Sequence, residues 1–200
     1  MNLKKIFGLA FAFCAIAAGA ALTSSTASAA VYTYTNKEDG YSIMCPMKPL
    51  GVLPASVLHE NSKGSVLVFA NDGYKINKAW IIIPDGFNNN DLPDLTKLSD
   101  KDAEALAEKL DENGAYAYID VLPVTAKSKG VFAVTAKEIM IDTDGDGTPD
   151  TEAKADTQMV VMFFRSPKGR PFKVELIDNP EIVPQHVSEF RAGVSTLKDI

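Results

Sequence analysis

The fold is decided by the stretch TQMVVMFFRSPKGRPFKVELI, residues 157–177. Two apolar runs, 157–165 and 171–177, are rich in β-branched and aromatic residues and flank Ser166–Gly169, whose composition is typical of a turn. So short a connection joins antiparallel neighbours, because parallel strands need a crossover of a dozen or more residues. This stretch therefore predicts a β-hairpin and, with it, an antiparallel sheet.

Six further apolar runs, bounded by Gly, Pro, Asn or Asp, predict additional strands. They cover residues 31–35, 41–45, 65–70, 79–83, 116–124 and 131–141. The expected order is four strands, a helix, four strands and a helix. Because short connections join the last four strands, we expect these to be antiparallel neighbours.

Two segments carry the apolar stripe of an amphipathic helix. The first has Ser99 as its N-cap, acidic residues in its first turn and Gly114 at its end. Its stripe comprises Ala103, Leu106, Ala107 and Leu110. The second runs from about Pro184 to Leu197, with a stripe of Val187, Phe190, Val194 and Leu197. The predicted fold class is α+β, a single domain over residues 30–200 with an antiparallel β-sheet covered by the two amphipathic helices.

The first 29 residues have the composition of a secretory signal peptide. Lys4 and Lys5 are followed by the apolar run Ile6–Leu22 and by small residues that end at Ala29. A positive start, an apolar segment and small residues at the cleavage site predict removal after Ala29 and a secreted or periplasmic protein without a transmembrane anchor. One alternative is a transmembrane helix, for which the apolar run is at the short limit. Another is a lipoprotein anchored through Cys14, although the residues before it are not those that lipidation favours.

Composition and charge exclude several classes of partner. The chain is 46% hydrophobic and 23% charged, with a formal net charge of −6. Without the first 30 residues, which hold two lysines and no acid, 18 basic and 26 acidic residues remain, a net charge of −8. This acidity argues against nucleic acid, which requires a basic face, and against attachment to anionic lipids. Cys45, the one cysteine left, can form no internal disulfide and is predicted to be a buried apolar residue.

Residues 142–150, DTDGDGTPD, carry the most specific chemical signal in the chain. Calcium prefers six to eight oxygens, and its binding loops place carboxylates at positions 1, 3 and 5, a glycine at 6 and further oxygens at 7 and 9. These positions are Asp142, Asp144, Asp146, Gly147, Thr148 and Asp150. We therefore predict a structural calcium ion in a hairpin at 142–153, with the ligands Asp142, Asp144, Asp146, Thr148 and Asp150.

The loop resembles the calcium loops of thrombospondin type 3 repeats and, less closely, those of EF-hands and dockerins. It departs from the EF-hand at position 12, where Ala153 replaces a bidentate Glu, and from thrombospondin repeats in being single. The predicted flanks are strands, and we expect the weak affinity of extracellular modules, ~10⁻⁴–10⁻³ M. The alternative is a solvated acidic turn without an ion, since Asp and Gly are common turn residues.

The first strands carry a second resemblance. Residues 32–46, YTYTNKEDGYSIMCP, resemble the start of domains in the PsbP/Mog1-like α/β/α sandwich group. There an early hairpin precedes a central antiparallel sheet and the chain ends in a packed helix. The group's usual Trp after the proline is absent, because Met47 and Lys48 follow Pro46. The group is not defined by a catalytic motif, so the resemblance implies a fold and no reaction.

The chain contains few of the residues that catalysis requires. With two histidines, His59 and His186, a His-rich zinc site is excluded, and neither a Gly-x-Ser-x-Gly elbow nor a nucleotide-binding loop is present. We expect His59 in a surface loop, His186 partly exposed on the last helix and Trp80 in the core.

These observations favour an exported non-enzymatic binding or accessory domain of the bacterial-type cell envelope. Its expected partners are a calcium ion and an envelope protein or ligand that the sequence does not identify. Two alternatives stay open. One is an envelope hydrolase that uses paired carboxylates, and the other is a structural envelope protein with a metal-free loop.

Overall fold

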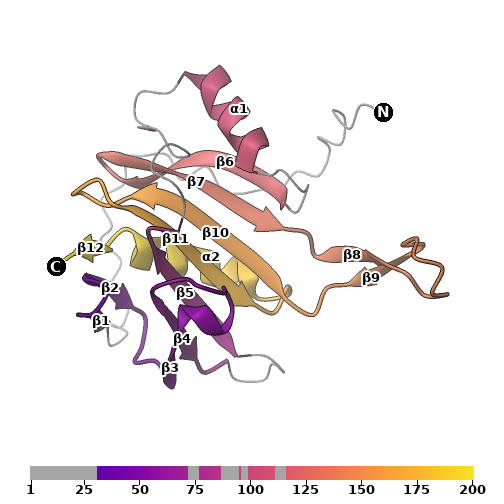
Figure 1. Cartoon of the computed structure of the whole chain (residues 1–200), viewed down its shortest axis with the longest axis horizontal. Coiled ribbons are helices and arrows are strands. Elements are labelled where there is room, and N and C mark those ends of the chain that lie inside the picture. The colour runs from indigo at the N-terminus through magenta and orange to yellow at the C-terminus, as the bar shows by residue number, and fades with distance from the viewer. Residues whose placement is uncertain (1–30, 72–76, 87–94, 96–98, 111–115) are drawn as a thin grey trace.

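The fold is built on a seven-stranded antiparallel sheet. This computed structural model describes residues 31–71, 77–86, 95, 99–110 and 116–200; the expected signal peptide at 1–29 and the helix end at Gly114 lie outside them. The strands are β3 (Gly51–Pro54), β4 (Ser65–Phe69), β5 (Lys78–Pro84), β6 (Tyr116–Thr125), β7 (Ser128–Thr135), β10 (Gln158–Arg165) and β11 (Pro171–Asp178). Their order is β3–β4–β5–β11–β10–β7–β6 (Figure 1).

The hairpin predicted from residues 157–177 is confirmed and lies at the centre of this sheet. β10 and β11 pair from Gln158↔Asp178 to Arg165↔Pro171. The backbone N–H of Ser166 donates to the carbonyl of Arg170 at 2.8 Å and closes the turn. Each strand has a second neighbour, β7 for β10 and β5 for β11. Strands in this position are buried on both faces, which is why their sequences are almost continuously apolar.

One face of the main sheet packs against helix α2 (Val183–Val194) and a small three-stranded sheet. The small sheet has β1 (Tyr32–Asn36), β2 (Tyr41–Cys45) and β12 (Lys198–Asp199), in the order β1–β2–β12. Trp80 is fully buried in this core, and its ring contacts Phe69 and Phe190 at centroid distances of 5.4 and 5.6 Å. The predicted burial of Trp80, Cys45 and the stripe of the last helix is confirmed.

The opposite face of the main sheet carries two smaller apolar clusters. Helix α1 (Asp100–Leu110) adds Leu106 to one cluster, and the 3-10 helix η1 (Ala55–Val57) adds Ala55 to the other. Ser99 caps α1 as predicted, because its hydroxyl accepts the backbone N–H of Asp102 at 3.3 Å. Glu175 of β11 lies between the two clusters and is fully buried.

The prediction that two amphipathic helices cover the sheet is wrong. Of the residues that the structure describes, 48% are in strands and 15% in helices, so β-structure predominates. α1 lies at the β6 end of the sheet (Figure 1), and α2 shares its face with the small sheet. The physical reason is that β2 buries Tyr41, Ile43 and Cys45 against the main sheet and so supplies a cover that the prediction assigned to helices. Among the described residues, no helix is long and apolar enough to span a bilayer.

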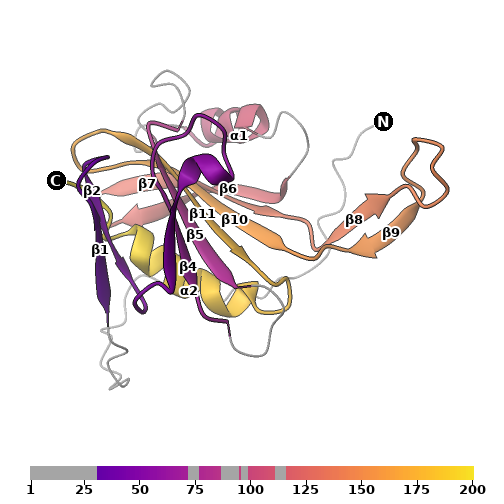
Figure 2. The same cartoon turned by 60° about the horizontal axis from the view of Figure 1, so that its bottom comes forward.

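The predicted strand 131–141 is in fact two strands. β7 ends at Thr135, and β8 (Glu138–Ile141) pairs with β9 (Thr151–Lys154) in a separate hairpin. Figures 1 and 2 show this hairpin, called the arm (residues 138–154), projecting from the body of the protein. The apolar residues of β8 were expected in the sheet, but they are exposed on the arm.

Candidate functional site

The acidic loop 142–150 forms the tip of the arm. β8 and β9 pair from Glu138↔Lys154 to Ile141↔Thr151. The backbone N–H of Asp150 donates to the carbonyl of Ile141 at 3.0 Å and closes the neck of the loop. Every residue of the loop is exposed. The side chains predicted to bind calcium therefore face solvent, at a distance from the core.

The carboxylates of Asp142, Asp144 and Asp146 converge within this loop. One oxygen from each lies within 4.8 Å of the other two. Asp142 also holds the turn, because its Oδ1 accepts the backbone N–H of Gly145 and its Oδ2 that of Gly147, both at 2.7 Å. These two donors, Gly147 first, lower the pKa of the Asp142 carboxyl below its ordinary value. The loop thus favours an ionised carboxylate at its first position.

Two glycines allow the chain to take this path. Gly145 and Gly147 have φ values of +80° and +86°, in the left-handed region where most side chains are strained. The structure shows a bend at Gly147, the glycine that calcium loops have at position 6, and a second one at Gly145. Together they bring the backbone N–H groups toward Asp142.

Asp150 is not part of the three-carboxylate cluster. Oδ1 of Asp150 accepts the hydroxyls of Thr151 and Thr143 at 2.9 and 3.0 Å, and these bonds lower the pKa of its carboxyl. Thr148 donates its backbone N–H to Oδ1 of Asp146 at 2.7 Å. Asp150 thus ties the neck of the loop, and its role as a ligand, like that of Thr148, stays a prediction.

The donor set of the loop suits a hard cation. The loop offers carboxylate, hydroxyl and backbone oxygens and contains neither sulfur nor imidazole, which is the chemistry that Ca²⁺ prefers. At position 12, Ala153 pairs with Ile139 inside the arm and supplies no carboxylate. Three clustered carboxylates fall short of six to eight ligands, so an ion held there would keep several waters. The residues therefore fit a weakly bound calcium ion.

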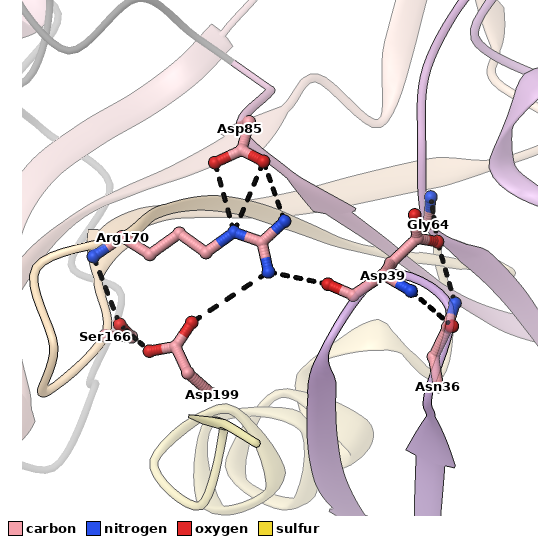
Figure 3. Close-up of polar contacts among 7 residues, drawn as sticks. All are labelled: Asn36, Asp39, Gly64, Asp85, Ser166, Arg170 and Asp199. Atoms are coloured by element: carbon pink, nitrogen blue, oxygen red, sulfur yellow. Dashed lines mark hydrogen bonds and ion pairs between the residues drawn. The ribbon is translucent and has the colours of Figure 1, made fainter.

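A second polar cluster joins distant parts of the chain around Arg170 (Figure 3). Its Nε and Nη2 donate to Asp85 at 3.1 and 2.7 Å, and its Nη1 donates to the backbone carbonyl of Asp39 at 2.6 Å. Nη1 also lies 4.0 Å from Asp199, which accepts the hydroxyl of Ser166. Hydrogen bonds from Arg170 lower the pKa of the Asp85 carboxyl. This cluster clamps the β1–β2 turn, the β10–β11 turn and β12 together.

Two buried carboxylates of β11 each contact a histidine, and the sequence does not reveal these contacts. Oε2 of Glu175 lies 2.7 Å from Nε2 of His59, and its Oε1 lies 2.6 Å from Nζ of Lys173. Oδ2 of Asp178 lies 2.6 Å from Nδ1 of His186. Both histidines are partly exposed, whereas both carboxylates are fully buried. The sequence signal that could have indicated these contacts is an acidic residue inside an apolar strand, Glu175, or at its end, Asp178.

These features define a mainly antiparallel β-protein that carries an acidic arm. No protein-family model and no curated protein matches the chain. Among solved structures, the chain is similar to the solution structure of cyanobacterial PsbP (CyanoP) from Synechocystis sp. PCC 6803. The two are 12% identical with a TM-score of 0.46, over 91% of this chain and 98% of that chain. A similarity at this level assigns no function to the chain.

Proposed function

We propose that this protein is an exported, non-enzymatic accessory domain of the cell envelope that binds a calcium ion at the tip of its arm. The observation that carries the proposal is the convergence of Asp142, Asp144 and Asp146 within 4.8 Å of one another. Like charges so close repel, and a divalent cation between them converts the repulsion into attraction. The signal-peptide composition of residues 1–29 supports an exported destination, and weak calcium sites are typical of extracellular modules.

The proposed role of the ion is to stabilise the arm. An isolated two-stranded hairpin is marginally stable in water, and the side chains of β8 and β9 are almost all exposed. An ion that binds the folded loop and not the unfolded one stabilises the hairpin by mass action. At a free calcium concentration about ten times Kd, this effect is about 1.4 kcal/mol.

The hydrolase alternative has weaker support. It requires two facing carboxyl groups whose pKa values are pushed apart. Asp85 and Asp199 both face Arg170, but the pKa of Asp85 is lowered, whereas a general acid needs a raised one. Glu175 and Asp178 project to opposite faces of β11, because an odd number of positions separates them on a strand. Neither pair has the geometry of a carboxylate dyad.

Calorimetric titration with calcium tests the proposal. We expect a heat of binding with a Kd of ~10⁻⁴–10⁻³ M and slower amide hydrogen exchange in residues 138–154 when calcium is present. Asp144→Ala should abolish both effects while the protein in chelator stays folded. Asp156→Ala removes an exposed acid outside the arm and should leave both effects unchanged. If the wild-type protein shows no heat of binding and no change in hydrogen exchange at millimolar calcium, the calcium proposal is wrong, and the alternative of a structural protein with a metal-free loop is supported.

A further inference from the structure

The edge strand β3 and the segment after it carry an apolar surface that nothing in the described structure covers. This surface, called the β3 edge patch, consists of five large side chains that are each about half exposed or more: Leu50, Val52, Leu53, Val57 and Leu58. The ten residues from Pro49 to Leu58 contain no charged side chain. β3 stands at one end of the strand order, next to β4. Native proteins protect exposed edges with charges, prolines or short strands, and this edge lacks charges, so its protection is limited to its length of four residues and to Pro54.

The patch extends to both faces of the sheet. Val52 pairs with Leu67, which belongs to the core under α2, and Leu53 pairs with Val66, which belongs to the cluster under η1. Successive residues of a strand point to opposite faces, so Val52 and Leu53 project on opposite sides of the same edge. A partner that covered one face would leave the other in water. A strand added beside β3, in the plane of the sheet, covers both.

The part of the patch that follows β3 is held firmly in place. Ala55 is fully buried, and its backbone N–H donates to the carbonyl of Gly64 at 3.0 Å. The contact of His59 with Glu175 fixes the other end of the segment to β11. Val57 and Leu58 therefore face solvent on a segment anchored from beneath. An anchored surface loses little conformational entropy when it binds.

We infer that the β3 edge patch is the contact of a two-fold symmetric dimer, in which β3 pairs antiparallel with β3 of a second copy of this chain. A two-fold contact requires a surface that is complementary to itself, and an uncharged apolar edge has that property. Two copies with a net negative charge repel each other, and this repulsion is smallest for a contact through Pro49–Leu58, where no charged side chains meet.

The size of the patch sets the strength of this dimer. Five partly exposed side chains amount to a few hundred Å² per copy, on the order of the largest apolar patch of a typical monomer. A standard stable complex buries roughly 800 Å² per partner. Pro54 has no N–H to donate and limits the strand pairing to the residues before it. The dimer is therefore weak and reversible.

Sedimentation velocity of the purified chain, from micromolar to millimolar concentration, tests this inference. We expect a monomer–dimer equilibrium that strengthens with added salt, because salt screens the repulsion between acidic copies. Val52→Lys places like charges across the two-fold contact and should raise the dimer Kd by about tenfold or more. Leu58→Lys should also raise the dimer Kd. Agreement between the two variants would show that the effect does not come from a folding defect of Val52→Lys alone.

Met140→Lys is the matched control. Met140 is 55% exposed on the arm, close to the 48% of Val52, and the substitution adds the same charge far from β3 in sequence. It should leave the dimer Kd unchanged, and circular dichroism should show the wild-type fold in all three variants. A chain that stays monomeric at millimolar concentration overturns the inference, as would a chain whose edge pairs with another protein instead. A dimer that Met140→Lys weakens as much as Val52→Lys does overturns it as well.

Discussion

Nε2 of His59 lies 2.7 Å from Oε2 of Glu175, a carboxylate that is fully buried at the centre of the main sheet. Nζ of Lys173 forms an ion pair with the other oxygen of this carboxylate, Oε1, at 2.6 Å. A buried carboxylate is costly unless charged or hydrogen-bonding groups compensate it. The segment that follows η1 is therefore attached to β11 by a contact whose loss leaves an acceptor buried and unpaired.

We predict that His59→Ala lowers the free energy of unfolding by about 1–3 kcal/mol, the cost of leaving a buried acceptor unsatisfied. His59→Gln keeps a side-chain N–H of similar reach and should lose less. Urea denaturation of the two variants beside the wild type measures both values. Equal losses would mean that the packing of the imidazole, and not its hydrogen bond, stabilises this segment.

The ion pair of Asp85 with Arg170 predicts how the stability of the protein depends on pH in acid. Hydrogen bonds from Arg170, and then its charge, lower the pKa of the Asp85 carboxyl from its ordinary 3.8. A carboxyl whose pKa is lower in the folded state stabilises that state above the unfolded pKa, and this contribution is lost as pH falls through the folded pKa. Because Asp85 is half exposed, Asp85→Asn should lower the free energy of unfolding by less than about 1 kcal/mol at pH 7. In urea denaturation, the difference from wild type should begin to close below about pH 4, and a difference that stays constant into acid contradicts the assignment.

Gly193 of α2 allows the helix to lie close to Trp80. A Cβ atom at this position would come within 2.5 Å of two carbons of the indole ring. We predict that Gly193→Ala destabilises the protein by about 1–3 kcal/mol, because the helix or the ring must move in a packed core. Thermal unfolding and urea denaturation measure the loss. Gly51→Ala is the matched control: its added Cβ meets nothing within 4 Å, so its effect should stay within about 0.5 kcal/mol.

The features that the sequence predicted correctly are local ones. The hairpin 157–177 and the cap at Ser99 depend on turn and capping residues a few positions apart, and the burial of Trp80 follows from its own apolar run. Asp142, Asp144 and Asp146 lie close together because they alternate with Thr143 and Gly145 in one tight loop, and that they bind calcium stays a prediction.

What the sequence did not reveal depends on contacts between distant segments. Whether β2 joins the main sheet or covers it is decided by Tyr41 and Ile43 packing on strands far along the chain. The break between β7 and β8 falls at the charged pair Lys137–Glu138, but this pair does not tell where the following strand goes, because Ile139 has the same hydropathy in a core or on an exposed arm. Glu175 contacts His59, which lies 116 positions away in the sequence, and no local sequence pattern indicates a contact between residues so far apart.

The separation of the arm from the body gives the last prediction. The arm joins the body at Lys137 and Ala155, where the backbone N–H of Ala155 donates to the carbonyl of Lys137 at 2.8 Å. Two residues, Asn-Gly, can close a hairpin at such a pair, so they can replace residues 138–154. Because the side chains of β8 and β9 are almost all exposed, we predict that this deletion changes the free energy of unfolding by no more than about 0.5 kcal/mol.

Calorimetry should show that calcium binding is lost, and sedimentation should show that the dimer through β3 is kept. If the deletion unfolds the body, the arm is part of the fold and not an appendage. If calcium still binds, the ion lies elsewhere than at Asp142, Asp144 and Asp146.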